Sequence, residues 1–159
     1  MTTSTTKTIV GRKEWCSFPE LAIPAVKARV DSGAKTSSLH AFNIKPFERD
    51  GEKWVSFEVH PLQKNRKTTI HCEAPILDKR SVKSSSGVAQ KRYVISTTLE
   101  HNQIQWEIEL TLSNRDSMGY RMLLGREAMI GRMMVDPEES FLGGKLSPSQ
   151  LKARYAKNP

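Results

Sequence analysis

The group in this chain best placed for chemistry is the carboxylate of Asp31. It follows the predicted strand Ala28-Arg29-Val30 and precedes Ser32-Gly33-Ala34. A carboxylate at a tight turn can act as a general acid or base. The Ser32 hydroxyl can donate to a nearby backbone carbonyl, and Gly33 allows a partner to approach the backbone closely. On these residues alone, a plain Asp-Ser-Gly turn remains the more common explanation.

A second segment, far along the chain, changes this interpretation. Met122-Leu123-Leu124-Gly125-Arg126 is an apolar run that ends in glycine and arginine. A strand leading into Asp-Ser-Gly-Ala, followed much later by such a run, resembles the retropepsin half-barrel. In that fold the later strand lies beside the aspartate turn and supports it.

The resemblance narrows to one bacterial family, the RimB-type retropepsin-like proteins, often labelled ATP-dependent zinc proteases. It covers roughly Lys7 to Gly143. The segments that carry it are Val10-Gly11-Arg12, Glu14-Trp15, the stretch from Ala28 to Ala41, and Leu123-Leu124-Gly125-Arg126 through Val135-Asp136.

The sequence contains no motif for binding the zinc or the ATP that this label mentions. There is no H-E-x-x-H, no C-x-x-C and no phosphate-binding glycine loop, and a G-x-S-x-G elbow is also absent. A metal site assembled from distant residues stays open, but we expect no metal and no cofactor. The residues that could supply imidazole or thiolate ligands are His40, His60, His71, His101, Cys16 and Cys72.

The resemblance implies that the chain holds half of a catalytic site. Only Asp31 stands in an Asp-Ser-Gly-Ala setting, so two copies would bring their Asp31 side chains together as a homodimer. Two adjoining carboxylates share one proton, which makes one a general base and the other an acid. The residues expected to support this turn are Ser32, Gly33, Ala34, Leu124 and Gly125.

The basic residues of the chain indicate the charge of its substrate. Many retropepsins have an acidic residue after the alanine, but here it is Lys35, and the net charge is +8. Arg126 then needs another partner, with Glu127, Asp136 and Glu14 as candidates. We expect an acidic or polyglutamylated protein substrate, linked through the family to ATP-grasp glutamate ligases. The candidate substrate-binding residues are Lys35, Thr36, Arg12, Arg126, Ser86 and Gly87.

The alternative is a non-catalytic module that keeps the fold and holds an acidic protein or RNA on its basic surface. The segment Ser84–Gly87 bears on this choice, because it falls where a retropepsin flap would close over a ligand. Basic residues flank it, namely Lys79, Arg80, Lys83, Lys91 and Arg92. The same segment is equally typical of an exposed surface loop.

The elements that position these residues are mostly short strands. In Ile104–Leu112 the apolar residues alternate with polar ones, and Glu100–Gln103 before it is typical of a hairpin turn. Asp50-Gly51 predicts another turn, between the Phe42–Phe47 run and a strand around Trp54. Further strands are expected at Thr8–Val10, Ala25–Val30, Lys67–Cys72 and Met122–Leu124.

Helices are few in this pattern. Glu127–Ile130 predicts a short helix ended by Gly131, and Ser147-Pro148 with Gln150 forms a capping box for a helix in the tail. We therefore expect an all-β, retropepsin-like half-barrel. The expected organisation is a flexible N-terminus over 1–6, the domain over 7–143 and a tail with a short helix over 144–159.

Composition agrees with one domain of this kind. The chain has 159 residues, of which 37% are hydrophobic and 26% charged. It contains no apolar run long enough to cross a membrane and begins without the pattern of a secretory signal. Two cysteines suit a reducing compartment, so we expect a cytoplasmic protein with free thiols.

Overall fold

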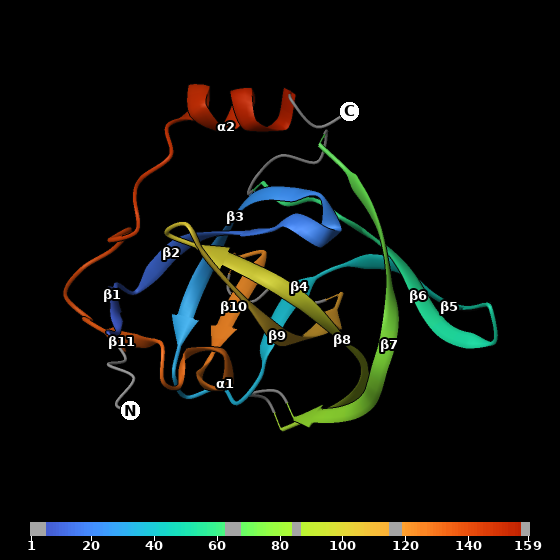
Figure 1. Ribbon diagram of the computed structural model, residues 1–159. Helices are drawn as coiled ribbons and strands as arrows, with labels where there is room; N and C mark the ends of the chain where they lie inside the picture. The colour runs from blue at the N-terminus through green and yellow to red at the C-terminus, as the bar shows by residue number, and fades with distance from the viewer. Residues whose placement is uncertain (1–5, 63–67, 84–86, 115–118, 157–159) are drawn as a thin grey trace, which may run out of the picture.

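The structure is a computed structural model that describes residues 6–62, 68–83, 87–114 and 119–156. Strands dominate it, which confirms the all-β prediction (Figure 1). The elements are β1 (Thr8–Val10), β2 (Lys13–Phe18), η1 (Pro19–Leu21), β3 (Ile23–Asp31), β4 (Ser37–His40), β5 (Phe42–Arg49), β6 (Glu52–Val59), β7 (Ile70–Lys83), β8 (Ala89–His101), β9 (Ile104–Ser113), β10 (Met122–Gly125), α1 (Arg126–Met129), β11 (Met133–Val135) and α2 (Pro148–Ala156).

One large sheet holds most of the strands, in the order β2-β3-β10-β4-β9-β8-β7-β6-β5. An additional pairing of β2 with β8, at Ser17 and Glu100, curls the sheet into a barrel. β1 and β11 form a separate two-stranded parallel sheet. The strands expected at Thr8–Val10, Ala25–Val30 and Met122–Leu124 are present as β1, β3 and β10. Of the strand expected at Lys67–Cys72, Lys67 lies outside the described residues, and β7 begins at Ile70 and continues to Lys83. β4 lies inside the Asp31–Ala41 stretch and was not expected as a strand.

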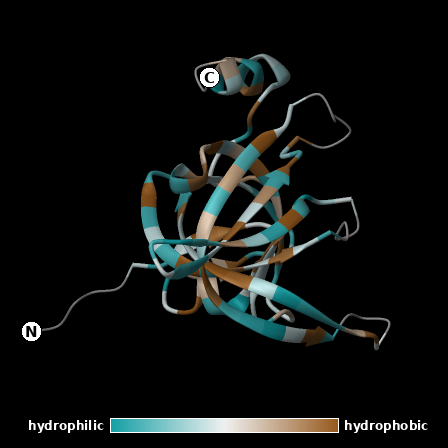
Figure 2. Ribbon diagram, turned by 90° about the vertical axis from the view of Figure 1, so that its right-hand side faces the viewer, coloured by the Kyte–Doolittle hydropathy of each residue, from teal (hydrophilic) through white to brown (hydrophobic). Residues whose placement is uncertain are grey.

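The core fills the inside of the barrel with residues from alternate positions of each strand. Phe18, Phe57, Leu39, Leu99 and Leu110 are all fully buried there. Bands of hydrophobic and hydrophilic residues alternate along the strands in Figure 2, as expected for a sheet with one covered face.

β9 departs from simple alternation at both of its ends. Ile104 begins the strand next to a turn and is 47% exposed, although it has the parity of the apolar face. Thr111 and Ser113 have the opposite parity and are buried. In this half β9 is hydrogen-bonded to β4 along one edge and to β8 along the other. The Thr111 hydroxyl donates to the Ser37 carbonyl oxygen at 3.3 Å.

Of the two predicted hairpin turns, one has the predicted length in the structure and the other is shorter. Asp50-Gly51 joins β5 to β6 with φ of 53° and 79°, the left-handed pair that such a turn requires. The turn between β8 and β9 is shorter than expected. It consists of Asn102-Gln103 alone, with φ of 52° and 67°, and His101 is a buried strand residue.

Both predicted helices form. The Ser147 hydroxyl accepts from the Gln150 N–H at 3.2 Å, and the Gln150 side chain accepts from the Ser147 N–H at 2.8 Å, which completes the capping box of α2. The Tyr155 hydroxyl fastens α2 to the barrel by donating to the Ala25 carbonyl oxygen. In the described part of the chain, no helix is long and apolar enough to span a bilayer.

Candidate active site around Asp31

Asp31 is the last residue of β3, and β10 lies next to β3 in the sheet. The two strands run parallel, with Val30 opposite Leu124 and Asp31 opposite Gly125. Both strands point toward the lower side of the molecule in Figure 1, where α1 also lies. The predicted pairing of the Asp31 segment with the Leu-Leu-Gly segment is thus a direct strand contact.

Gly125 allows the chain after Asp31 to pass very close to β10. A Cβ atom at this position would lie 2.7 Å from the Thr36 carbonyl carbon and 2.9 Å from the Ser37 nitrogen. The Gly125 N–H donates to the buried Ser37 hydroxyl at 3.0 Å. A glycine is required here because backbone, which cannot move aside as a side chain can, fills the space.

The turn after Asp31 is held by its own backbone and by the start of α1. The Gly33 N–H donates to Asp31 Oδ1 at 2.9 Å, and the Ala34 N–H donates to the Asp31 carbonyl oxygen at 3.2 Å. The Arg126 N–H donates to the Ala34 carbonyl oxygen at 2.8 Å. These contacts orient a carboxylate that stays partly exposed, with Ser32 and Gly33 exposed beside it.

The structure gives Arg126 a partner that was not among the three predicted acidic residues, Glu127, Asp136 and Glu14. Glu14 is bound elsewhere. Arg126 Nη1 donates to the Gly33 carbonyl oxygen at 3.1 Å, so the guanidinium supports the Asp31 turn directly. Glu127 lies 4.0 Å from the Lys35 ammonium, and both side chains are largely exposed, at 56% and 70%. An exposed pair of this kind contributes about 0–1 kcal/mol, so Lys35 keeps most of its freedom.

The other candidate substrate-binding residues are Arg12, Thr36, Ser86 and Gly87. Arg12 is exposed, and its carbonyl oxygen accepts the Val30 N–H at 2.9 Å, one residue before Asp31. Thr36 packs its backbone against Gly125. Gly87 is exposed with φ of 86°, while Ser86 lies outside the described residues.

The β7–β8 hairpin places its basic residues on two different faces. Cross-strand pairs put Lys79, Lys83 and Lys91 on the exposed face, and Lys79 lies 5.1 Å from the centre of the Tyr93 ring. Arg80 and Arg92 face the other way. Arg80 donates hydrogen bonds to Glu109 of β9 and to Asp78 of β7, and these bonds raise the pKa of its guanidinium above the usual value.

Sequence reasoning missed a buried carboxylate. Glu14 of β2 is completely buried and accepts four hydrogen bonds. Oε2 accepts the N–H groups of Gly11 and Leu142 at 2.7 and 2.9 Å, and Oε1 accepts the Gly143 N–H and His101 Nε2 at 2.9 and 3.1 Å. Burial alone would raise the pKa of Glu14, but the bonds from His101 and the three backbone groups outweigh it and lower that pKa.

A set of basic residues on β2 and β3 was also missed. Lys27 and Arg29 precede Asp31 by four and two residues in the same strand, and Lys13 of β2 is paired with Arg29. The signal that could have found them is the strand alternation itself, counted backward from Asp31.

Comparison with known proteins agrees with this architecture. Residues 9–145 match the RimB-like family, described as retropepsin-like aspartic endopeptidase RimB. A crystal structure of a Legionella pneumophila protein of unknown function is similar, with a TM-score of 0.72 and 27% identity over 87% of this chain and 99% of that one. The retropepsin-like fold predicted from the Asp31 and Gly125 segments is thereby confirmed.

Longer relatives contain a similar segment. Proteins named probable alpha-L-glutamate ligase are 60% identical to the chain in Desulfotalea psychrophila and 56% identical in Shewanella pealeana, over 95% and 96% of this chain. The chain spans about a third of the length of these relatives, 32% and 33% respectively. The family match and these identities together show that the chain belongs to the RimB-like family of retropepsin-like proteins.

Proposed function

We propose that this protein is an aspartic peptidase that acts in the cytoplasm as a homodimer on an acidic or glutamylated protein. The observation that carries the proposal is the setting of Asp31. Its carboxylate is partly exposed at the end of a core strand, oriented by the Gly33 N–H and braced by Gly125 and Arg126. The description of the family as aspartic endopeptidases supports the same chemistry.

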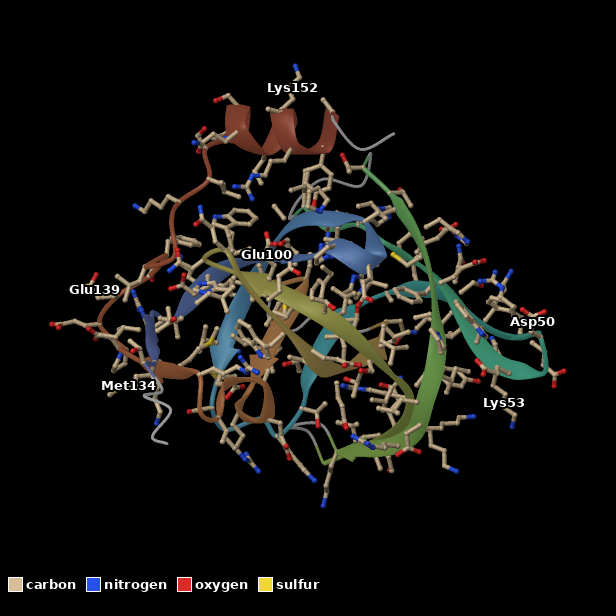
Figure 3. All side chains as sticks on the ribbon, in the orientation of Figure 1. Asp50, Lys53, Glu100, Met134, Glu139 and Lys152 are labelled. Atoms are coloured by element: carbon tan, nitrogen blue, oxygen red, sulfur yellow. The ribbon has the colours of Figure 1, made fainter. Side chains whose placement is uncertain are left out.

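The proposed dimer brings two Asp31 turns together. The small β1–β11 sheet supports it, because Ile9, Met134 and Val135 expose apolar side chains there at 55%, 58% and 40%. Met134 lies at the edge of the molecule in Figure 3, beside the end toward which β3 and β10 point in Figure 1. A second copy of the chain would cover this exposed apolar surface and complete the catalytic pair in the same step.

The two Asp31 carboxylates would then share one proton. The ionised carboxylate takes a proton from a water molecule as that water attacks the peptide carbonyl carbon, and the protonated one donates to the carbonyl oxygen. Collapse of the tetrahedral intermediate breaks the C–N bond. The nitrogen leaves with the proton that the first carboxylate took from water, and a hydroxyl of the intermediate returns its proton to the second carboxylate as the new carbonyl forms. General acid–base help of this kind contributes about 10²–10⁴ in rate.

The substrate class rests on charge and on the relatives. The net charge of +8 favours an acidic partner. The relatives named probable alpha-L-glutamate ligase join a segment like this chain to a further two thirds of sequence. A peptidase that travels with a glutamate ligase would trim the glutamate extensions which the ligase makes, so we propose oligoglutamate on a protein as the substrate.

The test compares Asp31→Asn with Asp50→Asn, a matched change at the exposed β5–β6 turn (Figure 3). Mass spectrometry would follow the release of glutamate from an oligoglutamylated peptide. We expect Asp31→Asn to lose at least a hundredfold in kcat, and Asp50→Asn to match the parent. Equal turnover in both variants would show that the Asp31 chemistry is wrong.

A second measurement separates the dimer from the chemistry. Sedimentation at micromolar concentration should give a mass near twice 18.0 kDa. Met134→Lys, at the exposed β11 position, should shift the protein to monomer and reduce turnover per chain as concentration falls. Full activity in a strict monomer would refute the shared pair of aspartates.

The alternative is a non-catalytic module that binds an acidic protein or RNA. The relatives' name favours it to this extent, since it describes a ligase and mentions no hydrolase. In that case the wild-type protein binds the oligoglutamylated peptide without releasing glutamate, and Asp31→Asn binds it equally well.

A further inference from the structure

Three basic residues share the sheet face of Asp31. Alternate residues of a strand point to the same side, so Lys27, Arg29 and Asp31 lie along one face of β3. Lys13 of β2 is directly opposite Arg29, and Leu123 of β10 is opposite Arg29 on the other side. We call Lys13, Lys27 and Arg29 the basic strip.

The basic strip lies on the solvent side of the sheet. The neighbours with the opposite parity, Glu14 and Ala28, are completely buried in the core. Lys13, Lys27 and Arg29 are each partly exposed, as Asp31 is. A ligand that reaches the Asp31 carboxylate therefore approaches the same face on which the strip lies.

The strand geometry sets the reach of the strip. At about 3.3 Å per residue, the Arg29 Cα lies about 7 Å from that of Asp31 and the Lys27 Cα about 13 Å. Lys13 lies about 5 Å across from Arg29. A peptide held over Asp31 consequently has side chains near its scissile bond within reach of Arg29 and Lys13, and a more distant one within reach of Lys27.

Two aromatic rings hold the lysines of the strip in place. Trp15 and Phe141 are stacked, with ring centres 6.2 Å apart and planes 21° from parallel. The Lys13 ammonium lies 5.4 Å from the centre of the Phe141 ring, and the Lys27 ammonium 5.8 Å from that of Trp15. A cation placed over a ring keeps N–H donors that can bind an anion.

This packing distinguishes a carboxylate ligand from a nucleic acid base. Proteins that bind single-stranded nucleic acids offer open aromatic faces on which bases stack. Trp15 and Phe141 already contact each other and a lysine each, so they act as supports for the cations. Together with Arg29, the two lysines form a row of positive charge on the face of Asp31, and such a row complements a chain of carboxylates.

We infer that the basic strip binds carboxylate side chains of an acidic peptide next to the scissile bond. This deepens the proposed function and rests on it in taking Asp31 as the reacting group. A guanidinium such as that of Arg29 can bind a carboxylate through two N–H donors, and Lys13 and Lys27 add positive charge next to it. Lys35 is not part of the basic strip, because it follows Asp31 in the chain and lies beyond the turn.

The test measures binding without turnover, in an Asp31→Asn background. A fluorescent oligoglutamate peptide is titrated by anisotropy, with an oligoglutamine peptide for comparison. Relative to that background, we expect Kd to rise about tenfold for Arg29→Gln and about threefold for Lys13→Gln. The matched control Lys53→Gln, at the far β5–β6 hairpin labelled in Figure 3, should stay within about twofold.

Further arms protect the test against trivial explanations. Arg29→Lys keeps the charge and should recover part of the affinity, while thermal unfolding shows whether Arg29→Gln is folded. Affinity for oligoglutamate should fall steeply between low and physiological salt. Unchanged binding in folded Arg29→Gln would overturn the inference, and so would tighter binding of an RNA oligonucleotide through the same three residues.

Failure of this inference is distinguishable from failure of the proposed function. Wild-type protein that binds oligoglutamate through the basic strip but releases no glutamate supports the inference and refutes the peptidase. If wild type releases glutamate and the Arg29→Gln variant does so with the same KM, the inference is refuted and the peptidase proposal stands.

Discussion

The buried carboxylate of Glu14 offers the sharpest test of how this fold is held together, through the substitution Glu14→Gln. The side chain keeps its size, but one of its two acceptor oxygens becomes an NH₂ donor. In the native protein both oxygens accept two bonds, and three of the four donors are backbone N–H groups. Backbone donors cannot reverse their role, so a glutamine cannot satisfy all of them.

The magnitude follows from which donors lose their acceptor. With the glutamine oxygen at the Oε2 position, Gly11 and Leu142 stay bonded and the Gly143 N–H faces the new NH₂ group. With the amide reversed, the Gly11 and Leu142 N–H groups are the ones left unpaired. A buried donor without a partner costs about 1–3 kcal/mol. We therefore expect Glu14→Gln to lower the free energy of unfolding by at least about 1–3 kcal/mol.

The pH dependence of this difference has a definite sign. The pKa of Glu14 is lowered in the folded state from an unfolded value near 4.5, so its ionised form stabilises the fold. That contribution is fully present above about pH 4.5 and is lost as pH falls through the folded pKa. Because glutamine does not titrate, the gap between wild type and variant should be largest near pH 7 and shrink below pH 4.5.

Urea unfolding followed by tryptophan fluorescence at several pH values measures both effects. Glu48→Gln is a matched control, since Glu48 is exposed on β5, and it should change the free energy of unfolding by no more than about 0.5 kcal/mol. A Glu14→Gln variant as stable as wild type at pH 7, or a gap that does not change with pH, would refute the reasoning.

The other predictions concern the glycine beside Asp31, the two thiols and metal. Gly125→Ala should destabilise the protein by about 1–3 kcal/mol and reduce any turnover, because the new methyl group meets the Thr36 backbone; calorimetry and the glutamate-release assay measure this. Burial, aided at Cys16 by the charge of Glu14, raises the pKa of Cys16 and Cys72 to about 12. Native protein should therefore resist iodoacetamide at pH 8, whereas the urea-unfolded chain should take up two labels, as counted by mass spectrometry. Prolonged chelation should leave the circular dichroism spectrum and the turnover unchanged, because no three potential ligands cluster within the described residues; stoichiometric zinc lost together with activity would contradict this.

Local signals in the sequence predicted most of the elements. The Asp50-Gly51 turn and the Ser147 capping box each depend on neighbours within a few residues, and both are present in the structure. The strand β9 also forms, with its alternation interrupted at both ends. The predicted turn Glu100–Gln103 is longer than the observed turn Asn102-Gln103, because a run of polar residues indicates exposure. His101 is buried by Glu14, a residue 87 positions away, and no local pattern reports such a contact.

In the candidate site, too, one contact could be predicted from the sequence and another could not. The pairing of the Asp31 and Gly125 segments was predictable because both follow a recognisable family pattern. The partner of Arg126 was not, because a side chain that binds the Gly33 carbonyl oxygen satisfies a backbone group. Sequence reasoning looked for an acidic side chain, and a backbone carbonyl leaves no trace in residue type.

β2 connects the core, the tail and the proposed binding face through one alternation. Glu14 points inward and fixes the N–H groups of Leu142 and Gly143, while the flanking Lys13 and Trp15 point outward. Phe141 adjoins the segment that Glu14 fixes, and its own N–H donates to the Lys13 carbonyl oxygen at 2.9 Å. Its left-handed φ of 57° costs about 1–3 kcal/mol for a bulky residue and persists only where its surroundings enforce it. The buried carboxylate therefore stabilises the tail in the conformation that places an aromatic ring under a cation of the basic strip.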